Sequence, residues 1–175
     1  QPVYHSRQTD GNVQICCGCA ILPLQTTVRG PAPLAQPGKW QDDIVEEALY
    51  FFRANVLYRN YQINGSADRT LIYLTFFTQQ CLKELENHLG RKEASRALSN
   101  LAIQTFAAPG QPGWHLGTLF PAGANAQETE LFKAYIRQCR EELAKRLVDR
   151  VYEDGTRSKH WMLFSKRKFM GKELR

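Results

Sequence analysis

The stretch "RTLIYLTFFTQQCLKEL", residues 69–85, decides the fold, because its apolar side chains leave no polar face on a helix. At about 100° per residue these side chains point in every direction around the helix axis: Leu71, Ile72, Tyr73, Leu74, Phe76 and Phe77. A helix that is apolar on all sides is normally buried on all sides. We therefore predict a central helix that the rest of the chain surrounds, and Ser66 is its candidate N-cap.

Further helices are predicted on both sides of this stretch. The first begins near Asp43, which can cap the free backbone amides, and Glu46 completes an acidic version of the capping box. A weaker helix covers residues 92–105 and a long one covers 127–152, each with an apolar stripe at helical spacing. A last short helix follows Ser158. The predicted fold class is all-α, with a central apolar helix surrounded by other helices.

Two long segments lack a helical pattern. In residues 1–41 the prolines that recur from Pro23 to Pro37 exclude a long helix, so we expect an extended arm laid over the domain. Its apolar anchors are Val13, Ile15, Ile21, Leu22 and Leu24. Residues 106–127 form a long Pro/Gly loop, a kind of segment that is usually functional or disordered, and apolar residues such as Trp114 argue against disorder. This loop either packs onto its own domain or contacts a partner.

Length and composition favour one globular domain. The 175 residues divide into the arm (1–41), a helical core (42–157) and a basic C-terminal tail (158–175). No apolar run approaches the roughly 20 residues of a spanning helix, so no membrane insertion is expected. No secretory signal is recognisable, and five cysteines are an odd number, which together favour a cytoplasmic protein with reduced thiols.

The net charge of +6 lies entirely in the tail. Residues 157–175 hold seven basic residues and one acidic residue, while the rest of the chain is balanced. Three of these basic residues are adjacent, between two phenylalanines. Such a run is often only a solvated face, but nucleic-acid binding and docking onto an acidic protein are both possible readings. Because the charge occupies one short segment rather than a groove-sized surface, we favour an acidic protein, with nucleic-acid binding through the tail as the alternative.

Aromatic side chains around the basic run are of the kind that anchor protein interfaces. The partner-binding hypothesis covers the three cations, the tail aromatics and one tryptophan of the long loop: Lys166, Arg167, Lys168, Trp161, Phe164, Phe169 and Trp114.

Motifs for catalysis or cofactor binding are missing from the sequence. Cys16, Cys17 and Cys19 could supply half of a zinc site, but no second half follows, so we expect small buried thiols and no metal. The four histidines are scattered, and no glycine-rich phosphate loop is present. We predict a protein that is not an enzyme and that has no cofactor.

Several quoted segments, in order along the chain, carry a resemblance to a known family. They are "DIVEEALYFFRANVLYRNYQI", "ADRTLIYLTFF", "PGQPG", "AYIRQCREELAKRL" and "SKHWMLFSKRKFM". Over essentially its whole length the chain resembles subunit 3 of the actin-related protein 2/3 complex, the assembly of seven subunits that nucleates branched actin filaments. The three clustered cysteines, His115 and His160 depart from the family's pattern.

The resemblance implies an all-helical, non-catalytic structural subunit that packs against actin-related protein 3 and lies near the mother filament. It implies that ATP is bound by the actin-related subunits rather than by this chain. The implied location is the cytoplasm and the actin cytoskeleton of the cell cortex. Because actins are acidic proteins, the resemblance also supplies a partner for the basic tail, although no family motif assigns the tail a contact.

Overall fold

The computed structural model describes residues 3–8, 11–35 and 42–175. Residues 36–41 of the expected arm, with Pro37, lie outside the described residues. Five helices are present in the described part of the chain: α1 (Ile44–Asn55), α2 (Ser66–Leu85), α3 (Arg91–Ile103), α4 (Ala126–Val151) and α5 (Lys159–Met162). Two short 3-10 turns, η1 (Gly117–Leu119) and η2 (Phe169–Gly171), lie in the long loop and in the tail.

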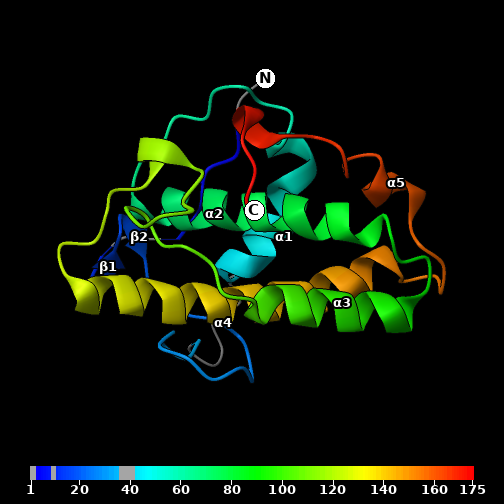
Figure 1. The fold of residues 1–175 in the computed structure, drawn as a ribbon, viewed down its shortest axis with the longest axis horizontal. Helices are drawn as coiled ribbons and strands as arrows, with labels where there is room; N and C mark the ends of the chain where they lie inside the picture. Colours follow the sequence, from blue (N-terminus) through cyan, green and yellow to red (C-terminus); the bar gives the residue numbers. More distant parts are fainter. Residues whose placement is uncertain (1–2, 9–10, 36–41) are drawn as a thin grey trace.

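Helix α2 is the centre of the structure, as the sequence predicts. It packs against α1, α3 and α4, and against a short strand of the N-terminal arm. In Figure 1 α2 runs along the long axis of the molecule, with α4 and α3 as a second layer beneath it. Leu71, Ile72 and Tyr73, which point about 100° apart around the helix, are all fully buried. The absence of a polar face is therefore matched by packing on every side.

The two predicted caps behave differently. Asp43 is the N-cap of α1, and its carboxylate accepts a hydrogen bond of 2.9 Å from the backbone N–H of Glu46, which confirms Asp43 as the cap. The Glu46 carboxylate does not close a capping box but forms ion pairs with Arg146 and Arg150 of α4. Ser66 does not cap α2: it is the first helical residue, and Gly65 occupies the cap position without a side-chain bond. The carboxylate of Asp68 instead accepts from the N–H of Asn64 at 2.9 Å, just before the helix begins.

The prediction of an all-α fold is wrong, because the N-terminal arm contains a small antiparallel sheet. Strands β1 (Ile15–Cys16) and β2 (Cys19–Ala20) pair Ile15 with Ala20 and Cys16 with Cys19. Between them Cys17 and Gly18 have φ angles of 49° and 76°. Two consecutive positive φ values are those of the tight hairpin turn whose twist matches that of paired strands. The segment "ICCGC" is thus a hairpin, in which Cys16 and Cys19 are paired across the two strands.

The arm is held by its apolar residues downstream of the turn. Ile21, Leu22 and Leu24 are buried, whereas Ile15 is exposed and Val13 is only half-buried. The Tyr135 hydroxyl of α4 accepts from the Leu22 N–H at 2.9 Å and donates to the Leu22 carbonyl at 3.0 Å. This double hydrogen bond pairs both backbone groups of a buried residue that lies outside regular structure.

The long loop packs onto the body of the protein. Leu116 and Phe120 are buried, and the ring of Trp114 stacks on Tyr73 of α2 with centroids 6.3 Å apart. Trp114 also meets Phe120 and Phe132 edge-on, at 5.4 and 6.2 Å. Of the two interpretations that the sequence left open, packing onto its own domain accounts for these contacts.

Candidate functional site

The basic tail is fixed to the core at two points, and the first is Trp161 in α5. The Ser158 hydroxyl caps this short helix by accepting from the Trp161 N–H at 3.3 Å. The indole is only 8% exposed and stacks on Phe52 of α1 at 6.1 Å, while the Arg53 guanidinium covers it at 5.3 Å. Phe164 then meets Phe52 edge-on at 6.3 Å. These contacts join the start of the tail to α1.

The second fixed point is Phe169, which is fully buried. Its ring lies 5.0 Å from Phe76 of α2 and 6.0 Å from Tyr61. Its backbone N–H donates to the Gln79 Oε1 at 2.6 Å, and the Gln79 Nε2 donates to the Lys172 carbonyl at 3.2 Å. One side chain of the central helix thus holds the backbone on both sides of η2.

The three predicted cations lie between these two points and are all exposed. Lys166, Arg167 and Lys168 border a groove of about 260 Å³, whose other wall comes from α2. The Lys168 ammonium is 3.9 Å from Glu173, so part of its charge is balanced. Lys166 and Arg167 form no ion pair with any residue that the structure describes. Their charges are therefore directed to solvent from a backbone that the core holds in place.

The predicted set of seven residues divides into two environments. The cations, Trp161, Phe164 and Phe169 share the tail, whereas Trp114 belongs to the separate aromatic cluster of the long loop. Trp114 is half-buried and its indole N–H donates to the Gly117 carbonyl at 3.0 Å. The four aromatic residues thus have contacts within the chain, and the cations face outward.

An exposed apolar surface beside the tail was missed in the sequence. Tyr50 and Leu57 of the α1 region are 76% and 53% exposed, and Leu163 after α5 is 74% exposed. Tyr50, Arg53 and Leu57 follow one another at helical spacing, and Arg53 contacts Trp161 of the tail. The signal was present in the sequence, because Tyr50 and Leu57 fall outside the apolar stripe of the first helix.

The cysteines are buried, unlike reactive thiols. All five are free and buried. Burial, with further effects of neighbouring groups that include Glu128, raises the pKa of Cys17 to about 11. Such a thiol stays protonated at neutral pH, so it is a poor nucleophile and a poor metal ligand. Within residues 3–8, 11–35 and 42–175, no group of three or more His, Cys, Asp or Glu side chains could hold a metal ion.

None of the helices in the described residues is long and apolar enough to cross a membrane.

Comparison with known proteins identifies the family. Residues 1–174 match the family described as P21-Arc, the ARP2/3 complex ARPC3 (21 kDa) subunit. The chain belongs to this family. It is 42% identical over 170 residues to "Actin-related protein 2/3 complex subunit 3" of Arabidopsis thaliana, covering 96% of this chain and 97% of that protein. The protein of the same name in Schizosaccharomyces pombe is 42% identical over 182 residues, and 99% of each chain is covered.

The match extends to more distant members of the ARPC3 family. The subunit 3 of Saccharomyces cerevisiae is 39% identical over 180 residues, with 99% of each chain covered. Because the alignments span nearly the whole length of both proteins, the arm, the helical core and the basic tail all lie within the family's common region. The resemblance expected from the sequence is thereby confirmed.

Proposed function

We propose that this chain is a non-catalytic structural subunit of the Arp2/3 complex and supports the nucleation of branched actin filaments in the cytoplasm. In this proposal it packs against actin-related protein 3 near the mother filament, at the cell cortex. Membership of the ARPC3 family supports the role as a subunit. The finer placement is inferred from the surface of the tail.

The observation that carries the proposal is that the tail combines buried anchoring residues with exposed cations. Trp161 and Phe169 attach it to the core, and the three cations between them face solvent. A charged segment held at both ends loses less conformational entropy when a partner binds than a free tail would. Exposed charges at an interface mainly accelerate association and set orientation, rather than supplying most of the affinity. The tail is therefore suited to speed the association of an acidic protein surface and to set its orientation.

Apolar contact is expected next to this charged region. Tyr50, Leu57 and Leu163 are exposed beside the attachment of the tail at Trp161. Aromatic and aliphatic side chains in the middle of an interface, with charges at its rim, are the usual arrangement of stable protein contacts. We propose that this surface and the basic tail face the same neighbouring subunit.

The test compares two charge variants with the same change in net charge. The tail variant carries Lys166→Glu, Arg167→Glu and Lys168→Gln, the last chosen to avoid a second carboxylate beside Glu173. A control variant carries Arg29→Glu, Lys92→Glu and Lys145→Gln. These three residues are also exposed and have no ion pair with the described residues.

Both variants should melt near the wild-type temperature, since none of these side chains is buried. Only the tail variant should lose assembly into the complex or formation of filament branches. Its deficit should be largest at low salt, where the attraction is least screened. Equal losses in the two variants, or a tail variant that assembles and branches like wild type at every salt concentration, would contradict the proposal.

A further inference from the structure

Arg140 of α4 is a buried cation without a carboxylate partner among the described residues. It is 2% exposed, and its guanidinium lies between the rings of Phe77 and Phe106, 4.5 and 4.3 Å from their centroids. Its Nη1 donates to the Tyr73 hydroxyl at 3.2 Å and its Nη2 to the Leu101 carbonyl at 2.7 Å. Both acceptors are neutral. Buried charges in proteins are normally paired, so an unpaired guanidinium in a core needs an explanation.

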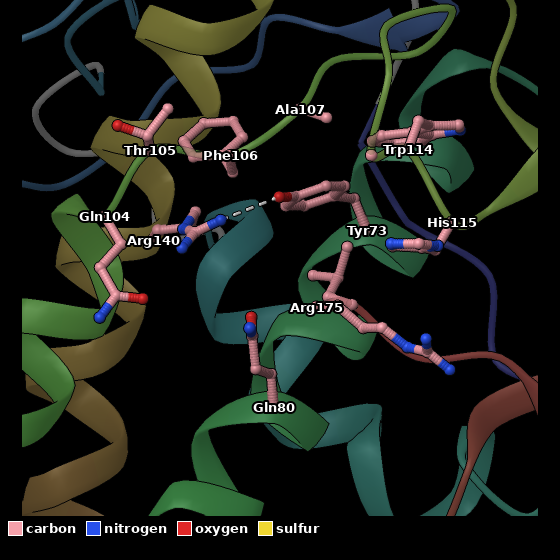
Figure 2. A pocket seen from close by; sticks show the side chains of 12 residues that line it. Tyr73, Gln80, Gln104, Thr105, Phe106, Ala107, Trp114, His115, Arg140 and Arg175 are labelled. Atoms are coloured by element: carbon pink, nitrogen blue, oxygen red, sulfur yellow. Dashed lines mark hydrogen bonds between the residues drawn. The ribbon is translucent and has the colours of Figure 1, made fainter.

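Two polar atoms of the same region have no partner. The buried Nε of Arg140 and the buried Oε1 of Gln80 form no hydrogen bond with the described residues. Both residues line one pocket of about 80 Å³ between α2, α4 and the long loop. Figure 2 shows the Arg140 guanidinium beside Phe106 and Tyr73, with the amide of Gln80 pointing toward them. The two residues that carry the unpaired atoms thus line the same pocket.

The lining of this pocket is polar, aromatic and positively charged. Besides Arg140 and Gln80 it includes Gln104, Thr105, Trp114, His115 and Arg175. No Asp or Glu is among the described residues that line it. Water would fit in this volume and pair the free N–H, but it would leave the buried charge without a counter-ion. A neutral amide group would leave the same deficit.

We propose that this pocket is a binding site for a carboxylate group, which accepts a charge-assisted hydrogen bond from the Arg140 Nε–H. The Gln80 amide can present its Nε2 to the same carboxylate, because the last torsion of a glutamine side chain turns at little cost. Hydrogen bonds between a guanidinium and a carboxylate are about twice as strong as neutral ones. The carboxylate supplies the negative charge that the side chains lining the pocket lack.

The first test uses two small probes of nearly the same shape, acetate and acetamide. The full chain is titrated with each at constant ionic strength, and NMR follows the Nε–H resonance of Arg140 and the indole N–H of Trp114. Acetate should shift both resonances in a saturable way, and acetamide should not. Equal shifts with acetamide, or no response to either probe, would overturn the proposal in favour of a water-filled pocket.

Three variants of Arg140 and Gln80 sharpen the result. Arg140→Met keeps an apolar chain between the two rings and should abolish the response of Trp114 to acetate. Gln80→Glu places a carboxylate beside Arg140 within the chain itself, so it should raise the melting temperature and remove the acetate response. Gln80→Leu is the matched control and should do neither. A Gln80→Glu variant less stable than Gln80→Leu would also overturn the proposal, whether or not Arg140→Met folds.

The carboxylate can come from a free small anion or from an acidic side chain of a neighbouring subunit. The assembly experiment that separates these two sources rests on the proposed function, whereas the acetate titration does not. If a neighbour's side chain fills the pocket, Gln80→Glu should weaken assembly of the complex and Gln80→Leu should not. If the ligand is a free anion, both variants should assemble like wild type. Once acetate binding has established the site, the first result assigns its carboxylate to a neighbouring subunit and the second to a free anion.

Discussion

Replacing Phe169 with alanine should detach the tail from the core. The Phe169 ring is fully buried, at 5.0 Å from Phe76 and 6.0 Å from Tyr61. Removing a fully buried phenylalanine ring costs about 3–5 kcal/mol of unfolding free energy. For a protein of this size, each kcal/mol lowers the melting temperature by roughly 2–4 °C. The variant should therefore melt roughly 6–20 °C below the wild type. Its backbone N–H can still donate to Gln79, so the change isolates the contribution of the ring.

Thermal unfolding and limited trypsin digestion measure the two consequences separately. Trypsin cleaves after Lys166, Arg167 and Lys168, which are exposed but lie on a backbone held at Trp161 and Phe169. Cleavage there should be faster in the alanine variant. Leu163→Ala is the control, because that side chain is 74% exposed and its loss should change stability by less than about 0.5 kcal/mol. An unchanged melting temperature and an unchanged cleavage rate in the Phe169 variant would refute the assignment of this ring as an anchor.

Three other substitutions test the core, the hairpin and the ion pairs. Leu74→Asp should prevent soluble expression, because it would bury an unpaired charge at a position of α2 that is fully enclosed. A soluble variant with a cooperative melting transition would contradict this. Gly18→Ala should destabilise by more than about 1 kcal/mol, since φ is +76° and the added Cβ would lie 2.7 Å from the Pro121 Cδ. Gly155→Ala, with φ +81° and no atom within 4 Å, should cost less, and chemical denaturation compares the two. Burial alone would raise the pKa of Asp43, but hydrogen bonds that include those from Arg146 lower it below 3.8, so the stabilisation by Asp43 is present above that pH and is lost as the pH falls further. Asp43→Asn should therefore flatten the acid limb of a curve of stability against pH. An equally steep acid limb in the variant would count against the ion pair.

Local signals in the sequence predicted the helices well. The pattern of Asp43 and Glu46 identified the start of α1, because a capping interaction involves residues three positions apart and needs no distant partner. The all-round apolar pattern of α2 identified the central helix for a similar reason: only burial on every side is compatible with it. Ser66 was misassigned by one position, because the helix already begins at Ser66 and the cap position belongs to Gly65, which has no side chain to signal it.

The hairpin of the arm was missed, because the sequence led us to expect only an extended arm with small buried thiols. Its turn at Cys17 and Gly18 needs positive φ at both positions, and a cysteine seldom adopts it. Contacts with distant residues support the hairpin: the Cys17 N–H donates to Glu128 at 3.0 Å, and the Thr70 hydroxyl donates to the Ala20 carbonyl at 2.8 Å. These partners lie far away in the sequence, so no local pattern contains them.

For the candidate sites the sequence by itself determined the composition, and the tertiary structure decided the geometry. The excess of charge in the tail and its flanking aromatic residues can be counted in the sequence. Only the packed structure shows that Phe169 is turned into the core and Lys166 to solvent. Likewise, Arg140 resembles any other arginine of a long helix until Phe77 and Phe106, from two other parts of the chain, enclose it. Burial depends on which distant segments meet, and periodicity along the chain reports only which side of one helix a residue occupies.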